Sequence, residues 1–217
     1  MLAVKSFVFN SMSQNTYIVW AQNRECVIVD AGCNSELEQE QFKEFIYGNN
    51  LKPLALLLTH GHFDHILGAA FICKEFNIEA WLHKEDAIEL LTAQKSASIY
   101  NVNMIHPFTK SHNLFEENIE LNFGTIKVEV MHTPAHSEGS VCFYFPSEKL
   151  LFSGDTIIKG GLGFSNNGYA SLIEILKQKI VRLPKETKIY CGHGEPTSLK
   201  EECESNPFFK IMLKQIS

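Results

Sequence analysis

The order of the predicted secondary-structure elements constrains the fold of this chain more than any other feature. Three β-rich runs, at 2–9, 15–21 and 25–30, are followed by an amphipathic helix at 35–47 and a short buried strand at 54–58. A similar order recurs later, with strands at 119–123, 126–132, 140–145 and 149–153, a helix at 170–182, a strand at 187–191 and a C-terminal helical stretch. This repeated order predicts an α/β (α+β) fold in which two mixed β-sheets pack face to face, with helices outside.

The part of the chain between these two series has a weaker pattern. The residues EAWLH predict a strand at 79–83, a helix is expected at 84–94, and the segment 95–118 is poorly patterned. No linker or repeat divides the 217 residues, and this length is sufficient to bury a sizeable core. We therefore expect a single domain over residues 1–217.

The overall composition argues against several classes of partner. The net charge is -6, and no run of basic residues is present to bind a phosphate backbone, so we expect no nucleic-acid partner. No apolar stretch approaches the length of a membrane span, and the N-terminus does not resemble a signal peptide. The six cysteines form no CxxC pair and lie mostly in apolar segments, as expected for reduced thiols. A cytoplasmic protein without a membrane partner is the expectation.

The motif THGHFDH, at residues 59–65, directly follows the buried strand 54–58. His60 and His62 point to the same side of an extended chain because the side-chain period of a strand is two. They can therefore bind one metal ion together. The intervening Gly61 removes a side chain where a ligand or an ion is expected to approach closely.

The second half of this motif offers two more potential ligands. Asp64 lies where the next helix begins, which favours a carboxylate, and His65 lies in the first turn. These two side chains can face a second ion beside the first. Three of the nine histidines in the chain fall within this one motif, so chance is a poor explanation for the pattern. Four ligands cannot complete two sites, and others must come from elsewhere.

Three later segments place a histidine or an aspartate just after a predicted strand. They are HTPAHSEGS at 132–140, FSGDT at 152–156 and YCGHGEP at 190–196. Aspartate is rare in this chain, and three of its four aspartates, Asp30, Asp64 and Asp155, lie at such strand ends. Imidazole and carboxylate ligands without thiolate suit zinc, iron or manganese and do not distinguish among them.

These motifs, in this order, resemble those of the metallo-β-lactamase superfamily, and within it the single-domain hydrolases similar to glyoxalase II (hydroxyacylglutathione hydrolase). The resemblance implies a four-layer αββα sandwich and two divalent transition-metal ions, zinc first, with iron or manganese as alternatives. It assigns His60, His62 and His136 to the first ion, Asp64, His65 and His193 to the second, and Asp155 to both. It also implies that Asp30 orients a ligand by hydrogen bonding.

The same resemblance implies the hydrolysis of a small-molecule thioester such as a hydroxyacyl-thiol conjugate. The two ions would present hydroxide to the carbonyl carbon, with Asp155 and Asp64 as catalytic carboxylates and Asp64 accepting or relaying a proton. Members that use glutathione carry Lys and Tyr after the bridging aspartate, where this chain has Phe164 and Asn166. We expect Lys159, Phe164 and Asn166 to contact the substrate. Because Phe164 and Asn166 differ from the residues that bind glutathione in the family, the thiol part of the substrate is left unidentified.

Other functions remain as alternatives. A persulfide dioxygenase of the superfamily uses one iron, held by the equivalents of His60, His136 and Asp155, and a lactone or ester hydrolase would use the same ligands. A zinc β-lactamase of the common type would have Cys in place of Asp155, a nuclease would need a basic surface, and a non-catalytic metal-binding protein would not need seven ligands. The remaining histidines are not expected to bind metal; they are His83, His106, His112 and His132.

Overall fold

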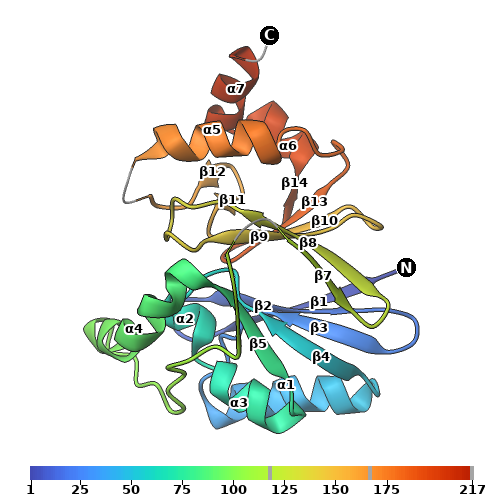
Figure 1. The fold of residues 1–217 in the computed structure, drawn as a ribbon, viewed down its shortest axis with the longest axis vertical. Helices are drawn as coiled ribbons and strands as arrows, with labels where there is room; N and C mark the ends of the chain where they lie inside the picture. Colours follow the sequence, from blue (N-terminus) through green and yellow to red (C-terminus); the bar gives the residue numbers. More distant parts are fainter. Residues whose placement is uncertain (117–118, 166–167, 216–217) are drawn as a thin grey trace.

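The structure is a computed structural model that describes residues 1–116, 119–165 and 168–215. It confirms the expected architecture of two mixed sheets with helices on their outer faces (Figure 1). The first sheet has the strand order β1 (Ala3–Phe9), β2 (Gln14–Trp20), β3 (Glu25–Val29), β4 (Lys52–Leu57), β5 (Glu79–His83), β6 (Asn113–Phe115). Strands β1 to β3 pair antiparallel, and β3 to β6 pair parallel.

The second sheet contains the later strands of the chain. Its order is β14 (Thr197–Ser198), β13 (Lys188–Cys191), β10 (Leu150–Gly154), β9 (Val141–Phe145), β8 (Ile126–His132), β7 (Glu120–Phe123). Only the β10–β13 pairing is parallel, and the others are antiparallel. A separate two-stranded hairpin, β11 (Ile157–Ile158) and β12 (Gly161–Leu162), follows β10.

The helices form the two outer layers of the sandwich. On the first sheet lie α1 (Glu36–Gly48) and α3 (Ala69–Phe76), and on the second lie α5 (Tyr169–Lys179), α6 (Leu199–Ser205) and α7 (Pro207–Lys214) (Figure 1). The short α2 (Phe63–Ile66) and the longer α4 (Ala87–Ile99) lie at one end of the first sheet. No helix in the described residues combines the length and the apolar character needed to cross a membrane.

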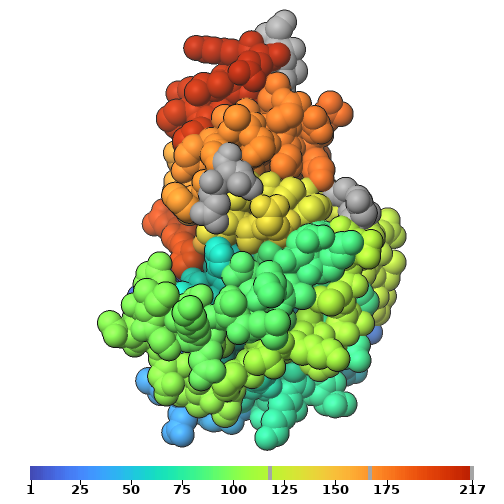
Figure 2. Space-filling view, turned by 60° about the vertical axis from the view of Figure 1, so that its left-hand side comes forward, coloured from blue at the N-terminus to red at the C-terminus, as the bar shows by residue number. Residues whose placement is uncertain are grey.

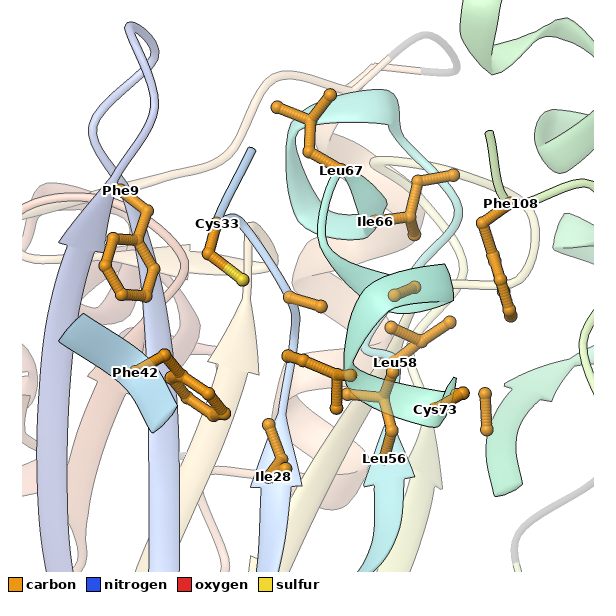
Figure 3. Close-up of a cluster of buried hydrophobic side chains, with 14 of the residues drawn as sticks. Phe9, Ile28, Cys33, Phe42, Leu56, Leu58, Ile66, Leu67, Cys73 and Phe108 are labelled. Carbon is orange, nitrogen blue, oxygen red and sulfur yellow. The ribbon is translucent and has the colours of Figure 1, made fainter. Parts of the chain in front are cut away.

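The alternation of side chains along each strand produces three separate apolar layers. In β3, Ile28 packs in the layer between the first sheet and its helices, whereas Val27 and Val29 pack between the two sheets. Figure 3 shows the outer layer, in which Phe42 of α1 lies near Ile28. The third layer joins the second sheet to its helices through residues such as Leu176 of α5. Each fully buried side chain of this size contributes roughly 1.5–3 kcal/mol to folding.

Two segments differ from the sequence expectations. The helix expected at 84–94 is instead a 3-10 turn, Lys84–Asp86, followed by α4, and Asp86 is the residue directly before α4. The poorly patterned segment 95–118 contains the end of α4 and the strand β6. Both differences arise from packing against distant parts of the chain, which the local pattern does not contain.

Candidate metal centre

The seven potential ligands predicted from the sequence lie on loops and short helices that follow β-strands. His60 and His62 follow β4, and Asp64 and His65 lie in α2. The other three come from the second sheet: His136 connects β8 to β9, Asp155 follows β10, and His193 follows β13. The structure brings all seven together at one edge of the sandwich.

Two sets of three side chains each have the geometry to hold one ion. The first ligand group is His60, His62 and His136, and the second ligand group is Asp64, His65 and His193. Within each group the ligand atoms lie within 4.8 Å of one another. Each group takes two side chains from the first sheet and one from the second, so the centre lies at the junction of the two sheets.

Asp155 lies between the two groups. One of its carboxylate oxygens is 3.5 Å from Nε2 of His136, and the same oxygen is 3.6 Å from Nε2 of His193. Its other oxygen is 3.4 Å from Nε2 of His65. Asp155 also forms a third set of compatible ligand atoms with His60 and His65. A carboxylate in this place can contact ions in both groups.

The buried carboxylate of Asp30 orients two histidines of the centre, His65 directly and His60 through Thr59. Nδ1 of His65 lies 2.9 Å from Oδ2 of Asp30, and Nδ1 of His60 lies 3.0 Å from Oγ1 of Thr59. Thr59 in turn donates both its backbone N–H and its hydroxyl to Asp30. Such contacts fix the imidazole orientation and direct Nε2 toward the centre.

Two further histidines are held by main-chain carbonyl groups. Nδ1 of His193 is 3.1 Å from the carbonyl oxygen of Met12, and Nδ1 of His136 is 2.9 Å from that of Phe164. Because a carbonyl group only accepts, each Nδ1 donates this hydrogen bond, and the Nε2 atom of each ring faces the centre.

Several buried polar atoms at the centre make no hydrogen bond. Nε2 of His60, Nε2 of His136 and Oδ1 of Asp155 are buried, and none makes a hydrogen bond within the described residues. Buried polar atoms are nearly always partnered, because an unsatisfied group loses its hydration without compensation. The three atoms converge from different segments, as metal ligands do. The residues present therefore fit a site for divalent metal ions.

The first ligand group favours neutral imidazoles. Burial lowers the pKa of His60 well below its usual value, and the neighbouring histidines lower it further. Burial, followed by the proximity of His136, lowers the pKa of His62 to about 4. A neutral imidazole is the form that binds a metal ion.

The second ligand group contains the carboxylate of Asp64 and lies beside those of Asp30 and Asp155. Burial opposes protonation of His65, but Asp64, Asp30 and Asp155 raise its pKa well above the usual value. Burial likewise opposes ionisation of Asp155, but His65 and other histidines hold its pKa below the usual range. These carboxylates create a strongly negative environment that attracts cations.

Comparison with known proteins agrees with this geometry. The family described as the metallo-beta-lactamase superfamily matches residues 11–193, most of the chain. The chain belongs to this superfamily. Its two-sheet sandwich is the metallo-beta-lactamase fold, and membership of this superfamily supports a metal-dependent hydrolase.

Three similar proteins illustrate this relationship. Hydroxyacylglutathione hydrolase GloC of Haemophilus influenzae is 29% identical over 202 residues, which cover 91% of this chain and 93% of the relative. The BLEG-1 B3 metallo-beta-lactamase superposes with a TM-score of 0.85 and 30% identity, covering 95% of this chain and 99% of that one. TTHA1623, crystallised in a di-iron-bound form, has a TM-score of 0.81 and 31% identity, covering 94% and 99%.

The expected substrate residues lie in the segment that follows Asp155 in this metallo-beta-lactamase fold. The Phe164 side chain is 70% exposed, and its carbonyl group holds His136. Lys159 forms an ion pair with Glu195, with Nζ 3.0 Å from Oε2. Asn166 lies outside the described residues. The segment also contains the β11–β12 hairpin.

The reason for the glycine in the metallo-beta-lactamase motif differs from our expectation. A Cβ atom on Gly61 would lie 2.8 Å from Cβ of Glu89 and 2.9 Å from the backbone oxygen of Asp86. The space is therefore occupied by the start of α4, and the expectation that a ligand or ion requires this glycine was wrong. Backbone packing of this kind requires the absence of a side chain.

The sequence analysis also missed Asp86, whose carboxylate contacts two ligand-bearing segments. It accepts hydrogen bonds from the backbone of Gly61 and Gly139 and from the hydroxyl of Ser137. A signal was present, because Asp86 is the fourth of only four aspartates in a glutamate-rich chain. We used that rarity for the other three only.

The remaining histidines do not join any of the three ligand sets found among the described residues. The rings of His83 and His132 stack with their centroids 4.0 Å apart. Nδ1 of His112 accepts a hydrogen bond from the backbone of Ala80. His106 lies on the surface.

Proposed function

We propose that this chain is a dinuclear metal-dependent hydrolase that cleaves small-molecule thioesters, in the manner of glyoxalase II. One observation carries the proposal: two ligand groups, each complete, lie side by side with Asp155 between them. A one-iron enzyme has no need of Asp64, His65 and His193, so the intact second ligand group favours a hydrolase over a persulfide dioxygenase. The di-iron form of TTHA1623 supports the proposed number of ions.

Each carboxylate and histidine has a definite part in this proposal. His60, His62 and His136 would hold one ion, and Asp64, His65 and His193 would hold the other. Two ions bound there would supply a water molecule of lowered pKa and a positive charge to polarise the substrate carbonyl. We propose zinc as the natural metal, because imidazole and carboxylate ligands suit it.

The catalytic carboxylates are Asp64 and Asp155. The carboxylate of Asp155 lies within 3.6 Å of His136 in the first ligand group and of His65 and His193 in the second. Oδ2 of Asp64 lies 3.1 Å from Nε2 of His193, and the Asp64 side chain keeps some contact with solvent. A carboxylate at the edge of the centre can accept a proton from the attacking water and return it to the departing thiolate.

The proposed substrate class rests on the relative named hydroxyacylglutathione hydrolase. A thiolate leaves readily, so the reaction does not require a strong general acid, and we find no further acid within either ligand group. The exposed Phe164 offers an apolar contact next to His136 for the acyl or the thiol part. Lys159, five residues before Phe164, forms an ion pair with Glu195. These two charged groups can bind polar groups on the thiol part of the substrate.

A substrate panel tests the proposal directly. Purified protein, loaded with zinc, manganese or iron and analysed for metal content, is assayed with acyl thioesters that include hydroxyacylglutathiones, and with lactones and β-lactams. We expect the highest kcat/KM with a thioester. Greater activity on β-lactams, as the name of the B3 relative would suggest, or on lactones would overturn the substrate class. Oxygen uptake with a persulfide, without thioester turnover, would overturn the proposal that the protein is a hydrolase and favour a persulfide dioxygenase.

A further inference from the structure

Asp86 is a buried carboxylate held entirely by neutral donors. Only 1% of it is exposed, and no lysine or arginine forms an ion pair with it in the described part of the chain. Oδ2 accepts from the backbone of Gly61 at 2.8 Å and from the hydroxyl of Ser137 at 2.7 Å, and Oδ1 accepts from the backbone of Gly139 at 2.6 Å. A buried charge with three good donors is firmly fixed.

The donors belong to the two segments that carry the first ligand group. Gly61 lies between His60 and His62, and Ser137 directly follows His136. One segment comes from the end of β4 in the first sheet and the other from the β8–β9 connection in the second. In the space-filling view, α4 (green) lies against the yellow surface of the second sheet (Figure 2). Asp86, at the start of α4, therefore connects the two segments.

Both segments approach Asp86 so closely that only glycine fits. A Cβ atom on Gly139 would lie 2.6 Å from Oδ1 of Asp86, and one on Gly61 would lie 2.9 Å from its backbone oxygen. Contacts shorter than 3.0 Å are essentially never seen for real Cβ atoms. The backbone beside each ligand is therefore pressed against α4 and has little freedom to shift.

The second ligand group is supported differently. Asp30 holds His65, and the carbonyl group of Met12 holds His193. None of the hydrogen bonds made by Asp86 reaches Asp30, His65, Met12 or His193. Asp30 also reaches His60 of the first ligand group through Thr59, whereas the hydrogen bonds of Asp86 go only to segments that carry the first group.

We propose that Asp86 is a positioning residue for the first ligand group, and that it sets the metal affinity of this group without touching the metal. The inference rests on the proposed two-ion centre. Asp86→Asn is the informative variant because an amide keeps the size of the side chain but accepts on one side only. Its NH2 group would face Gly61 and Ser137, or Gly139, and at least one backbone N–H would lose its acceptor.

The experiment measures Co²⁺ binding to each ligand group separately. His193→Ala disables the second group and His62→Ala disables the first, and Asp86→Asn is combined with each in the full-length, metal-free protein. Co²⁺ is titrated against a competing chelator while its visible absorption is followed. We expect Asp86→Asn to weaken binding by about 10- to 100-fold in the His193→Ala protein, and by no more than about twofold in the His62→Ala protein.

Glu89→Gln is the matched control. Glu89 is partly buried one turn further along α4, so its substitution removes a nearby negative charge without removing any of the hydrogen bonds to the two segments. Its Co²⁺ affinity should remain that of the parent protein. An equal loss in Glu89→Gln would mean that charge alone matters and would overturn the positioning role.

Two further outcomes decide the matter. Ser137→Ala removes one donor and provides the test if Asp86→Asn does not fold; we expect weaker binding at the first group only. Unchanged first-group affinity in the folded variants, or equal losses at both groups, would overturn the proposal. If the unsubstituted protein binds fewer than two Co²⁺ ions, the two-ion centre itself fails, which is a separate result.

Discussion

Oδ2 of Asp30 lies 2.9 Å from Nδ1 of His65, and both side chains are almost completely buried. Asp30 adopts a φ of 58°, in the left-handed region that residues other than glycine rarely occupy. The same carboxylate accepts two hydrogen bonds from Thr59, whose hydroxyl contacts His60. One strained residue therefore orients a histidine of each ligand group.

Asp30→Asn should weaken metal binding at both ligand groups. Asparagine tolerates a positive φ about as well as aspartate, so the substitution changes the hydrogen bonds and keeps the backbone. We expect a loss of about 10- to 100-fold in metal affinity, because the single amide oxygen cannot accept from both the backbone N–H of Thr59 and Nδ1 of His65. Chelator competition on the purified variant measures this loss. An unchanged affinity would show that the orientation of His65 does not depend on Asp30.

Asp155→Ala and Asp64→Ala should differ in how many ions they lose. Asp155 contacts both ligand groups, so its removal should lower the metal content from about two ions per chain to less than one and abolish hydrolysis. Asp64 belongs to the second group alone, and its variant should retain about one ion per chain. Elemental analysis after desalting gives the count. A single ion in the unsubstituted protein that Asp64→Ala leaves in place would contradict the dinuclear centre.

Glu202→Gln should destabilise the region that follows Asp155. Glu202 is fully buried and accepts hydrogen bonds from the backbone of Gly160, from Oγ1 of Thr197 at 2.7 Å and from Nδ2 of Asn206 at 2.6 Å. An amide cannot accept all of them, and a buried donor without an acceptor costs about 1–3 kcal/mol. Urea denaturation measures the free energy of unfolding.

Glu201→Gln is the control for this substitution. Glu201 is half exposed and pairs with Lys159 at 3.7 Å, so we expect a change of less than about 0.5 kcal/mol. Equal losses in the two variants would show that charge, and not the buried hydrogen bonds, holds α6 to the hairpin.

The buried thiols should make the protein unstable at high pH. Burial raises the pKa of Cys26 and Cys191 to about 12 and that of Cys142 to about 11, from the 9.0 of a free thiol. The unfolded chain therefore loses these protons first as the pH rises. The stability from the buried neutral thiols is complete below pH 9.0 and is lost as the pH rises through the folded-state values near 11 and 12.

Urea denaturation at a series of pH values tests this expectation. Each thiol contributes at most about 1.4 kcal/mol per pH unit between its unfolded and folded pKa values. The variant Cys26→Ala should be less stable at neutral pH but should lose stability more slowly as the pH rises above about 9. Parallel curves for the two proteins would assign the alkaline loss to other groups.

The local pattern of the sequence predicts two packed sheets and shows polar clusters at the strand ends, and the resemblance to the superfamily selects the seven ligand candidates among them. Strands alternate between two environments, and a polar cluster at a strand end interrupts that alternation visibly, as THGHFDH does after β4. The support of these ligands is not visible in this way. Asp86 bonds to residues 25, 51 and 53 positions away, and no local pattern contains such pairings.

Two other features escape prediction because the main chain makes the contact. The carbonyl group of Phe164 accepts a hydrogen bond from His136. Every residue type has this carbonyl group, so the identity of residue 164 does not reveal the contact. The packing of α4 on Gly61 depends on where the 3-10 turn at Lys84–Asp86 directs the helix. Side-chain identity carries little information about either.

Each ligand group takes side chains from both sheets, and this links cation concentration to the folding equilibrium. An ion that contacts His62 and His136, or Asp64 and His193, binds only when the two halves of the sandwich are docked. Free ligand at about 100 times its dissociation constant adds about 2.7 kcal/mol to the free energy of unfolding per site. Chelation should therefore lower the melting temperature, and the supply of metal should govern how long the protein survives as well as how fast it reacts.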